Sequence, residues 1–224
     1  MVKKVLIWSS FSFLIINNIQ GQQQDYIGFS GNTLMADFSN LNDQIRGEYP
    51  ELNNIITEFR LERSLLKARF GLGYYGSVSK ILIKNQGQKQ TLFSGYGAGV
   101  YYTYNLTPKK KLELFPKLTV GFRKYKLILG ETSNPVSVNN ILNASIKNYK
   151  FTNSGSYIDL GFGVNIPLKI KITDFQVGIN AGYRFDSGDW IYDESTPVYS
   201  GFSNLSGVYV GISIKSKLTK GGDL

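Results

Sequence analysis

The chain contains no cysteine and no histidine among its 224 residues. Without cysteine it has no disulfide to stabilise it, and it cannot be anchored as a lipoprotein through a cysteine that follows a signal peptide. Without histidine it lacks the side chain most often used as a general acid or base near neutral pH. Both absences weigh against catalytic classes that depend on a thiol or an imidazole.

Long hydrophobic runs are also missing beyond residue 21, although a transmembrane helix needs about 20 apolar residues. If the protein enters a membrane it must therefore do so as a closed β-barrel, which satisfies every backbone polar group. The N-terminus has a basic start, Met1–Lys4, an apolar segment, Val5–Ile16, and a polar end, Asn17–Gly21. This order predicts a secretory signal peptide over residues 1–21, followed by a single domain over residues 22–224. The alternative is an uncleaved anchor, but three serines interrupt the apolar segment.

Charge is the next constraint. The formal net charge is +9, and it falls to about +7 when Lys3 and Lys4 leave with the signal peptide. In an exported protein this balance indicates contact with anionic lipid or polysaccharide, and no nucleic-acid partner is expected.

Beyond Tyr26 the sequence alternates between two kinds of residue with a period of two, as strands do. The clearest run is Phe175–Phe185, in which valine, isoleucine and aromatic residues alternate with glycine, amides and charges. One face of each strand is therefore apolar, and the other collects glycine and polar residues. Glycine weakens a strand on a solvated outer face, but it makes room on the inner wall of a narrow barrel. The pattern predicts a barrel that is apolar outside and polar inside.

Connection lengths alternate as well, as they do in outer-membrane barrels with short periplasmic turns and longer external loops. The expected short turns are Ser64–Lys67, Thr107–Lys110 and Pro167–Lys169. The expected external loops are Ser39–Asn53, Lys84–Gln90, Gly130–Asn148 and Asp186–Asn204. The predicted fold is all-β, an eight-stranded antiparallel up-and-down transmembrane β-barrel with both termini in the periplasm.

The stretch Thr57–Gly76 is ambiguous. Its first half has the composition of a helix, but it also alternates, and a helix here would leave an odd number of strands. We therefore predict a strand hairpin over residues 55–69 that turns near Ser64–Lys67. Gly71–Gly76 spells the G-x-G-x-x-G pattern of a dinucleotide turn, but a β-type run follows it where that motif requires a helix. No cofactor is expected.

Charged residues on the polar faces are expected to point into the lumen, where acids and bases can pair and so avoid the desolvation cost of isolated charges. An eight-stranded barrel has an interior just wide enough for side chains to fill, so the interpretation is a salt-bridged plug, with a selective conduit or proton path as the alternative. The predicted set is Glu58, Arg60, Glu62, Arg69, Glu113, Lys117, Arg123, Asp159, Asp174 and Arg184.

Two further groups of residues lie near the predicted strand ends. Asp186, Asp189, Trp190, Tyr192 and Asp193 form an acidic, aromatic segment that either takes up a divalent cation or a ligand, or is an ordinary solvated loop. No catalytic or metal site is predicted. Aromatic residues expected at the membrane interfaces are Tyr74, Tyr102, Tyr104, Phe122, Phe151, Tyr183 and Phe185.

The segments SGYGAGVYYTYNL, QVGINAGYRF and SGVYVGISIKSKL, together with the predicted signal peptide and eight strands, resemble small Gram-negative outer-membrane barrels of the OmpA/OmpX-like and PorT-like type. The resemblance covers nearly all of the mature chain and rests on pattern rather than on an invariant motif. It implies an outer-membrane location, contact with outer-membrane lipid and insertion by the barrel-assembly machinery. Such barrels often end on an aromatic residue, whereas this chain continues past Leu218 with the tail Thr219–Leu224.

The expected function is a non-enzymatic outer-membrane barrel that acts in envelope structure or surface interaction through its external loops. One alternative, to which PorT-like barrels point, is a component of a secretion or assembly machine. Another is a soluble exported barrel that binds an apolar ligand, which would turn Val100, Leu118, Val177 and Val210 inward. An enzyme ranks last, because lipid A-modifying enzymes and proteases on such barrels are expected to use histidine.

Overall fold

The computed structural model describes residues 23–108, 111–131, 149–170, 173–192, 196–197 and 205–218. The predicted signal peptide and most of the predicted loop Gly130–Asn148 lie outside these residues. Among the residues described, no helix is long and apolar enough to cross a membrane.

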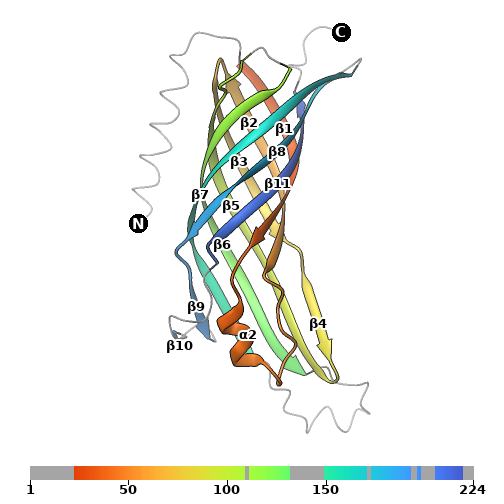
Figure 1. Ribbon diagram of the computed structural model, residues 1–224, viewed down its shortest axis with the longest axis vertical. Helices are drawn as coiled ribbons and strands as arrows, with labels where there is room; N and C mark the ends of the chain where they lie inside the picture. Colours follow the sequence, from red (N-terminus) through yellow and green to blue (C-terminus); the bar gives the residue numbers. More distant parts are fainter. Residues whose placement is uncertain are drawn as a thin grey trace.

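Eight long strands pair with their neighbours into one closed antiparallel barrel (Figure 1). The circuit closes where β1 pairs with both β2 and β11, and β8 pairs with both β7 and β11. The predicted fold class is thereby confirmed. The eight strands are β1 (Gln23–Met35), β2 (Ile55–Lys67), β3 (Phe70–Ser79), β5 (Lys89–Tyr104), β6 (Glu113–Glu131), β7 (Tyr149–Ile170), β8 (Thr173–Asp186) and β11 (Gly207–Lys217).

The ambiguous stretch at residues 55–69 forms the hairpin β2–β3, as predicted. Its turn, however, lies at Ala68–Arg69, between the paired residues Lys67 and Phe70, and not at Ser64–Lys67. Ala68 adopts a positive φ of 55°, the conformation that a two-residue hairpin turn requires. Similarly, β7 continues through the predicted turn at Pro167–Lys169 to Ile170.

Strand pairing shows at which end of the barrel β1 begins and β11 ends. Gln23 of β1 pairs with Lys67 beside the β2–β3 turn, and Lys217 of β11 pairs with Tyr26. The first and last described strands therefore meet the short turns at one end of the barrel. We call this the turn end, and the opposite end the loop end.

At the loop end, four small elements replace the plain loops that the sequence predicts. Residues Lys84–Gln90 form most of a tight hairpin, in which β4 (Leu82–Gln86) pairs with β5 across Gly87–Gln88. The predicted loop Ser39–Asn53 contains the helix α2 (Ser39–Ile45). The predicted loop Asp186–Asn204 contains β9 (Asp189–Tyr192) and β10 (Thr196–Pro197), and β9 pairs with β7.

Three strands are too long to end at the membrane surface. β5 has 16 residues, β6 has 19 and β7 has 22, whereas roughly 9–11 residues cross the hydrocarbon layer. In Figure 1, β5, β6 and β7 run past the rest of the barrel and carry β4, β9 and α2 beside them. We call these six elements, at their loop end, the extension.

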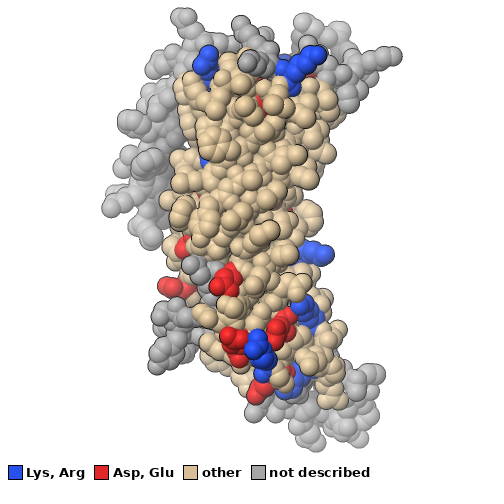
Figure 2. Space-filling view, in the orientation of Figure 1, with Lys and Arg blue, Asp and Glu red and all other residues tan. Residues whose placement is uncertain are grey.

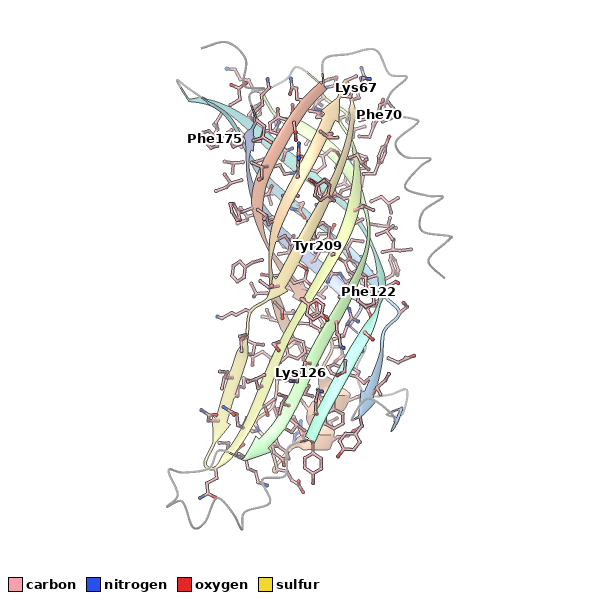
Figure 3. All side chains as sticks on the ribbon, turned by 180° about the vertical axis from the view of Figure 1, so that it is seen from behind. Lys67, Phe70, Phe122, Lys126, Phe175 and Tyr209 are labelled. Carbon is pink, nitrogen blue, oxygen red and sulfur yellow. The ribbon has the colours of Figure 1, made fainter. Side chains whose placement is uncertain are left out.

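Along β6 the two faces exchange their chemistry where the extension begins. Within the barrel the outward residues are apolar, including Leu118, Val120 and Phe122, and the inward ones are polar or glycine except for Phe115. Past Phe122 the outward residues become Lys124, Lys126 (labelled in Figure 3) and Ile128. Tyr125, Leu127 and Leu129 are buried on the inner side. One strand thus passes from a wall facing an apolar medium to a wall facing water.

The inner side of the extension is a hydrophobic core. The α2 segment lies over the sheet and contributes Phe38, Leu41 and Ile45, and Phe38 meets Phe93 edge-on at 5.6 Å between ring centroids. The Asn42 side chain bonds both the N–H and the C=O of Leu52 at 2.8 Å, which fastens the segment after the helix. Hydrogen bonds from Ser39 keep the pKa of Asp37, just before the helix, below its usual range. The predicted contact loop is therefore a folded cap.

Candidate functional site

The lumen at the level of the apolar belt is filled by charged and tyrosine side chains. Glu58, Arg60 and Glu62 alternate on β2 and all point inward because their spacing matches the period of a strand. Asp159 on β7 and Arg184 on β8 reach the same region, and Arg184 is only 1% exposed. Five of the predicted lumen residues therefore lie in the interior.

Four of these residues form one ion-pair cluster. Arg184 donates from Nη1 to Oε1 of Glu58 at 2.9 Å and from Nε to Oδ1 of Asp159 at 2.8 Å. Arg60 donates to Glu58 at 2.9 Å and lies 3.8 Å from Asp159. Two guanidinium groups thus balance two carboxylates. Each charge has partners that offset its desolvation, and removal of one member would leave another uncompensated.

Tyrosines complete this cluster. The guanidinium of Arg60 lies 4.4 Å from the ring centroid of Tyr75, and that of Arg184 lies 4.1 Å from the centroid of Tyr157. The hydroxyl groups of these two tyrosines touch each other, so the two rings bridge the lumen. Cation–π contacts of this kind are strongest when the cation is desolvated, as both arginines are here.

A second cluster lies nearer the turn end. Lys215 of β11 is 3.6 Å from Glu62 and donates to the hydroxyl of Tyr101 at 3.0 Å. The ring of Tyr101 lies between two ammonium groups, with Lys117 at 4.4 Å and Lys215 at 5.1 Å from its centroid. Lys117 was predicted to face the lumen and does so. Toward the turn end of this layer a cavity of about 40 Å³ remains, room for a few water molecules.

A third cluster closes the loop end of the lumen. Arg123 forms a double hydrogen bond with Asp186 and donates to Oδ1 of Asn153 at 2.6 Å. Both members of the ion pair are 2% exposed. Asp186, predicted to belong to an external contact loop, is instead the last residue of β8 and part of the interior.

Two predicted lumen residues, Arg69 and Asp174, lie at the turn end outside the filled lumen. Arg69 is exposed in the β2–β3 turn, because that turn comes later than the sequence pattern suggested; it bonds Tyr104 at 3.5 Å. Asp174 sits near the turn-end rim, 3.7 Å from Lys217, and is about half exposed. Glu113 does face the lumen at its turn end, as predicted: it is partly exposed, lines the cavity of about 40 Å³ and accepts a bond from Gln176 at 3.4 Å.

The described part of the acidic segment is divided between the core and the surface. Trp190 is buried in the core of the extension and Asp189 is exposed, whereas Asp193 lies outside the described residues. No group of three or more acidic, cysteine or histidine side chains suited to a metal ion occurs within the described part of the chain. Phe151, predicted at the membrane interface, packs inward against the same core.

Sequence reasoning missed Lys215 and the interior tyrosines. Lys215 lies on the polar face of its strand, so strand parity was sufficient to include it beside Glu62. The tyrosines were harder to assign, since tyrosine also occurs on the outer wall. Most interior tyrosines stand on the strand face that also carries glycine, and this shared face could have identified them. The interior tyrosines are Tyr75, Tyr101, Tyr125, Tyr157 and Tyr209.

Interior glycines provide the space for these rings. A Cβ placed on Gly73 would lie 2.2 Å from the Tyr101 ring, and one on Gly121 would lie 2.5 Å from the Tyr157 ring. In both cases the tyrosine is the paired residue on the adjacent strand. Glycine was expected to make room on the inner wall of the barrel, and the structure shows that side chains of the adjacent strand occupy this room.

The outer wall has the opposite character. Val100, Leu118 and Val210 point outward and are 53%, 43% and 44% exposed. Figure 2 shows the charged side chains gathered toward the two ends, with an almost uncharged wall between them on this face. This orientation contradicts the alternative of a soluble barrel with an apolar interior.

Comparison with known proteins identifies this architecture. No protein-family model and no curated protein matches the sequence. Among solved structures, a major outer-membrane protein of Thermus thermophilus aligns with a TM-score of 0.50 and 9% identity over 88% of this chain and 99% of that one. This chain has the fold of an outer-membrane β-barrel.

Two other solved barrels are similar at lower scores. Neisserial surface protein A aligns at TM-score 0.46 and 11% identity over 87% of this chain and 96% of that chain. Ail, the attachment invasion locus protein of Yersinia pestis, aligns at 0.46 and 11% identity over 89% of this chain and 100% of that one. At such low identity the likeness concerns the barrel fold alone.

Proposed function

We propose that this protein is a non-enzymatic outer-membrane barrel, closed to solutes, that displays the extension on the cell surface for interaction. The change of face chemistry along β6 carries the proposal. An apolar outer wall is suited to lipid. In the extension the lysines face outward and the apolar residues are buried inside, which is the arrangement of a domain exposed to water. The barrel then anchors a folded surface platform.

The interior supports the closed state. Three clusters of paired charges and tyrosines occupy successive levels of the lumen, and eight strands enclose little more than side chains. Purified barrels in a planar lipid bilayer should therefore show no stable porin-like conductance. A large, steady, open channel in the wild-type protein would contradict the closed lumen.

Topology can be tested cleanly because the chain has no native cysteine. Single variants Lys126→Cys in the extension, Phe122→Cys in the belt and Arg69→Cys in the turn should react differently with a membrane-impermeant maleimide. In intact cells only Lys126→Cys should be labelled. Arg69→Cys should need outer-membrane permeabilisation, and Phe122→Cys should need unfolding.

The outcomes separate the alternatives. Equal labelling of all three variants in intact cells, or recovery of the protein in the soluble fraction, would reject the membrane assignment. Labelling of Arg69→Cys but not Lys126→Cys in intact cells would reverse the topology and place the extension in the periplasm. Stoichiometric co-purification with envelope proteins from detergent would instead favour the secretion-machine hypothesis.

A further inference from the structure

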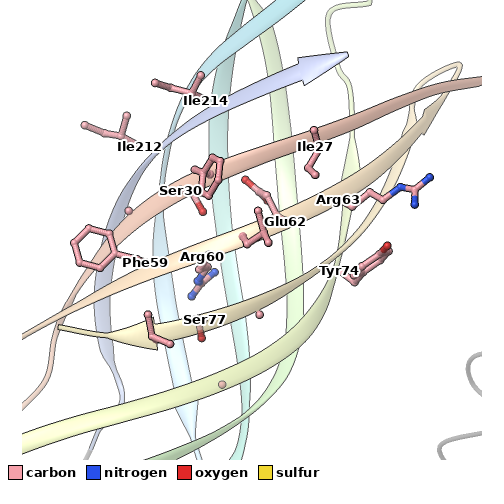
Figure 4. A pocket seen from close by; sticks show the side chains of 16 residues that line it. Ile27, Ser30, Phe59, Arg60, Glu62, Arg63, Tyr74, Ser77, Ile212 and Ile214 are labelled. Atoms are coloured by element: carbon pink, nitrogen blue, oxygen red, sulfur yellow. The ribbon is translucent and has the colours of Figure 1, made fainter. Parts of the chain in front are cut away.

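The lipid-facing wall carries a groove of about 990 Å³, at the upper end of the roughly 300–1,000 Å³ typical of ligand clefts. It runs over β11, β1, β2 and β3, and its walls are apolar side chains (Figure 4). The largest of these are Phe29, Phe59, Leu61, Tyr74, Ile212 and Ile214.

Two glycines form the floor of this groove. Gly31 pairs laterally with Ile212 on one side and Phe59 on the other, and Gly76 pairs with Leu61. A Cβ added to either glycine would meet no atom within 4 Å, so both face open space. These outward glycines differ from interior ones such as Gly73 and Gly121, which lie under tyrosine rings. The groove therefore results from the missing side chains of two outward glycines, and packing within the lumen plays no part in it.

An ion pair lies at the turn end of the groove. Arg63 is exposed and bonds Asp25 through Nε at 3.1 Å, while Tyr74 lies beside it on β3. The arginine points toward the nearby end of the barrel, as a long basic side chain does when its stem lies in lipid and its head reaches the interface. The groove thus has a charged end at the membrane surface and an apolar end deeper in the membrane.

The dimensions match one leaflet. Six residues separate Asp25 from Gly31, which is about 20 Å along the strand. With a strand tilt of about 40° this corresponds to about 15 Å along the membrane normal, half of the ~30 Å hydrocarbon layer. An acyl chain that begins at the ion pair would end near Gly31.

We propose that this groove binds one phospholipid of the periplasmic leaflet, with a zwitterionic headgroup that contains a primary ammonium. Its phosphate contacts Arg63, its ammonium contacts Asp25, and one acyl chain lies across Gly76 toward Gly31. Charge complementarity selects this ligand, since the site offers one cation and one anion side by side. The inference rests on the proposed membrane location of the barrel.

Native mass spectrometry tests the groove. Wild-type barrel is reconstituted in vesicles with equal amounts of phosphatidylethanolamine, phosphatidylglycerol and phosphatidylcholine, then released in mild detergent. We expect one retained phosphatidylethanolamine per barrel. Gly31→Leu/Gly76→Leu should lower its retention about tenfold by filling the groove. Ala181→Leu, which fills a smaller groove on the opposite wall, should retain the lipid as the wild type does.

Charge variants test the headgroup. Arg63→Gln should lower the retention of every anionic or zwitterionic phospholipid about fivefold. Asp25→Asn should lower phosphatidylethanolamine by a similar factor and leave phosphatidylglycerol unchanged, because only the former has an ammonium. Equal losses of both lipids in Asp25→Asn would overturn the headgroup assignment.

Other outcomes are equally decisive. If the wild type and Gly31→Leu/Gly76→Leu retain equal amounts of lipid, the proposal is overturned. It is also overturned if the wild type has the mass of two barrels and the double variant has the mass of one, because a second copy of the chain then occupies the groove. Heat-modifiable migration of each variant on a gel verifies folding. A wild type that fails to insert would reject the membrane barrel itself, whereas insertion without lipid retention rejects only this inference.

Discussion

At the scale of single residues, glycine has two opposite uses in this barrel. Interior glycines such as Gly73 are covered by a tyrosine of the neighbouring strand, and outward glycines such as Gly76 face open space. Strand parity alone separates the two kinds, since Gly73 and Gly76 are three residues apart on β3 and point to opposite faces. The depth of each contact, however, depends on cross-strand register.

This contrast gives a matched pair of variants. Gly73→Ala should destabilise the barrel by about 1–3 kcal/mol, because the new methyl group collides with the Tyr101 ring. Gly76→Ala should be neutral or slightly stabilising in the same urea titration of barrels folded in phospholipid vesicles. Equal effects of the two substitutions would contradict the described register.

Arg184 is the second test at this scale. Arg184→Gln should lower the free energy of unfolding by about 3–5 kcal/mol, because Glu58 and Asp159 lose their shared buried partner. Arg46→Gln, which removes an exposed ion-paired arginine just after α2, should leave the unfolding midpoint unchanged. Adding Glu58→Gln to Arg184→Gln should recover part of the loss. A single variant as stable as the wild type would show that the cluster is not energetically coupled.

At the scale of elements, the alternation in the sequence predicted the strands well and their ends poorly. The hairpin at residues 55–69 is correct because Glu58, Arg60 and Glu62 share one face. The β2–β3 turn was placed too early, since the residues around Ser64–Lys67 carry no glycine or proline to mark a turn. The loop-end elements were missed because α2 and β4 are short, and because α2 is stabilised by packing against residues distant in the chain.

The cap provides the prediction at this scale. Leu41→Ala removes a fully buried side chain from α2, at a cost of roughly 2–5 kcal/mol. We expect trypsin to cut faster at Arg46 while heat-modifiable migration of the barrel stays unchanged, because the cap core lies outside the belt. Asn40→Ala, an exposed neighbour on the same helix, should cleave at the wild-type rate. Loss of the whole barrel in Leu41→Ala would show that cap and barrel fold as one unit.

At the scale of the whole molecule, the defining property is an exchange of inside and outside along the long axis. In the belt the apolar face is outward, and in the extension it is inward. β6 changes from one regime to the other between Phe122 and Lys124 without a break in pairing to β5. The change from a lipid-facing to a water-facing outer surface therefore occurs within a continuous strand.

A charge placed on either side of this boundary should have opposite consequences. Val120→Arg, on the outward face of the belt, should lower the free energy of unfolding in phospholipid vesicles by about 2–4 kcal/mol. Ile128→Arg, outward on the extension of the same strand, should fold almost as well as the wild type. If Val120→Arg folded as readily as Ile128→Arg, the belt would not lie in lipid.

The sequence by itself determined the number of barrel strands, their inside-out polarity and most of the lumen charges. It could do so because strand parity is a local property, repeated with period two along every strand. Tertiary structure alone decided which charges meet, that Asp186 joins the interior with Arg123, and that Ser39–Asn53 folds into a cap. It also decided the groove over Gly31 and Gly76. These features depend on register between strands distant in the chain, and on side chains that find partners only once the barrel has closed.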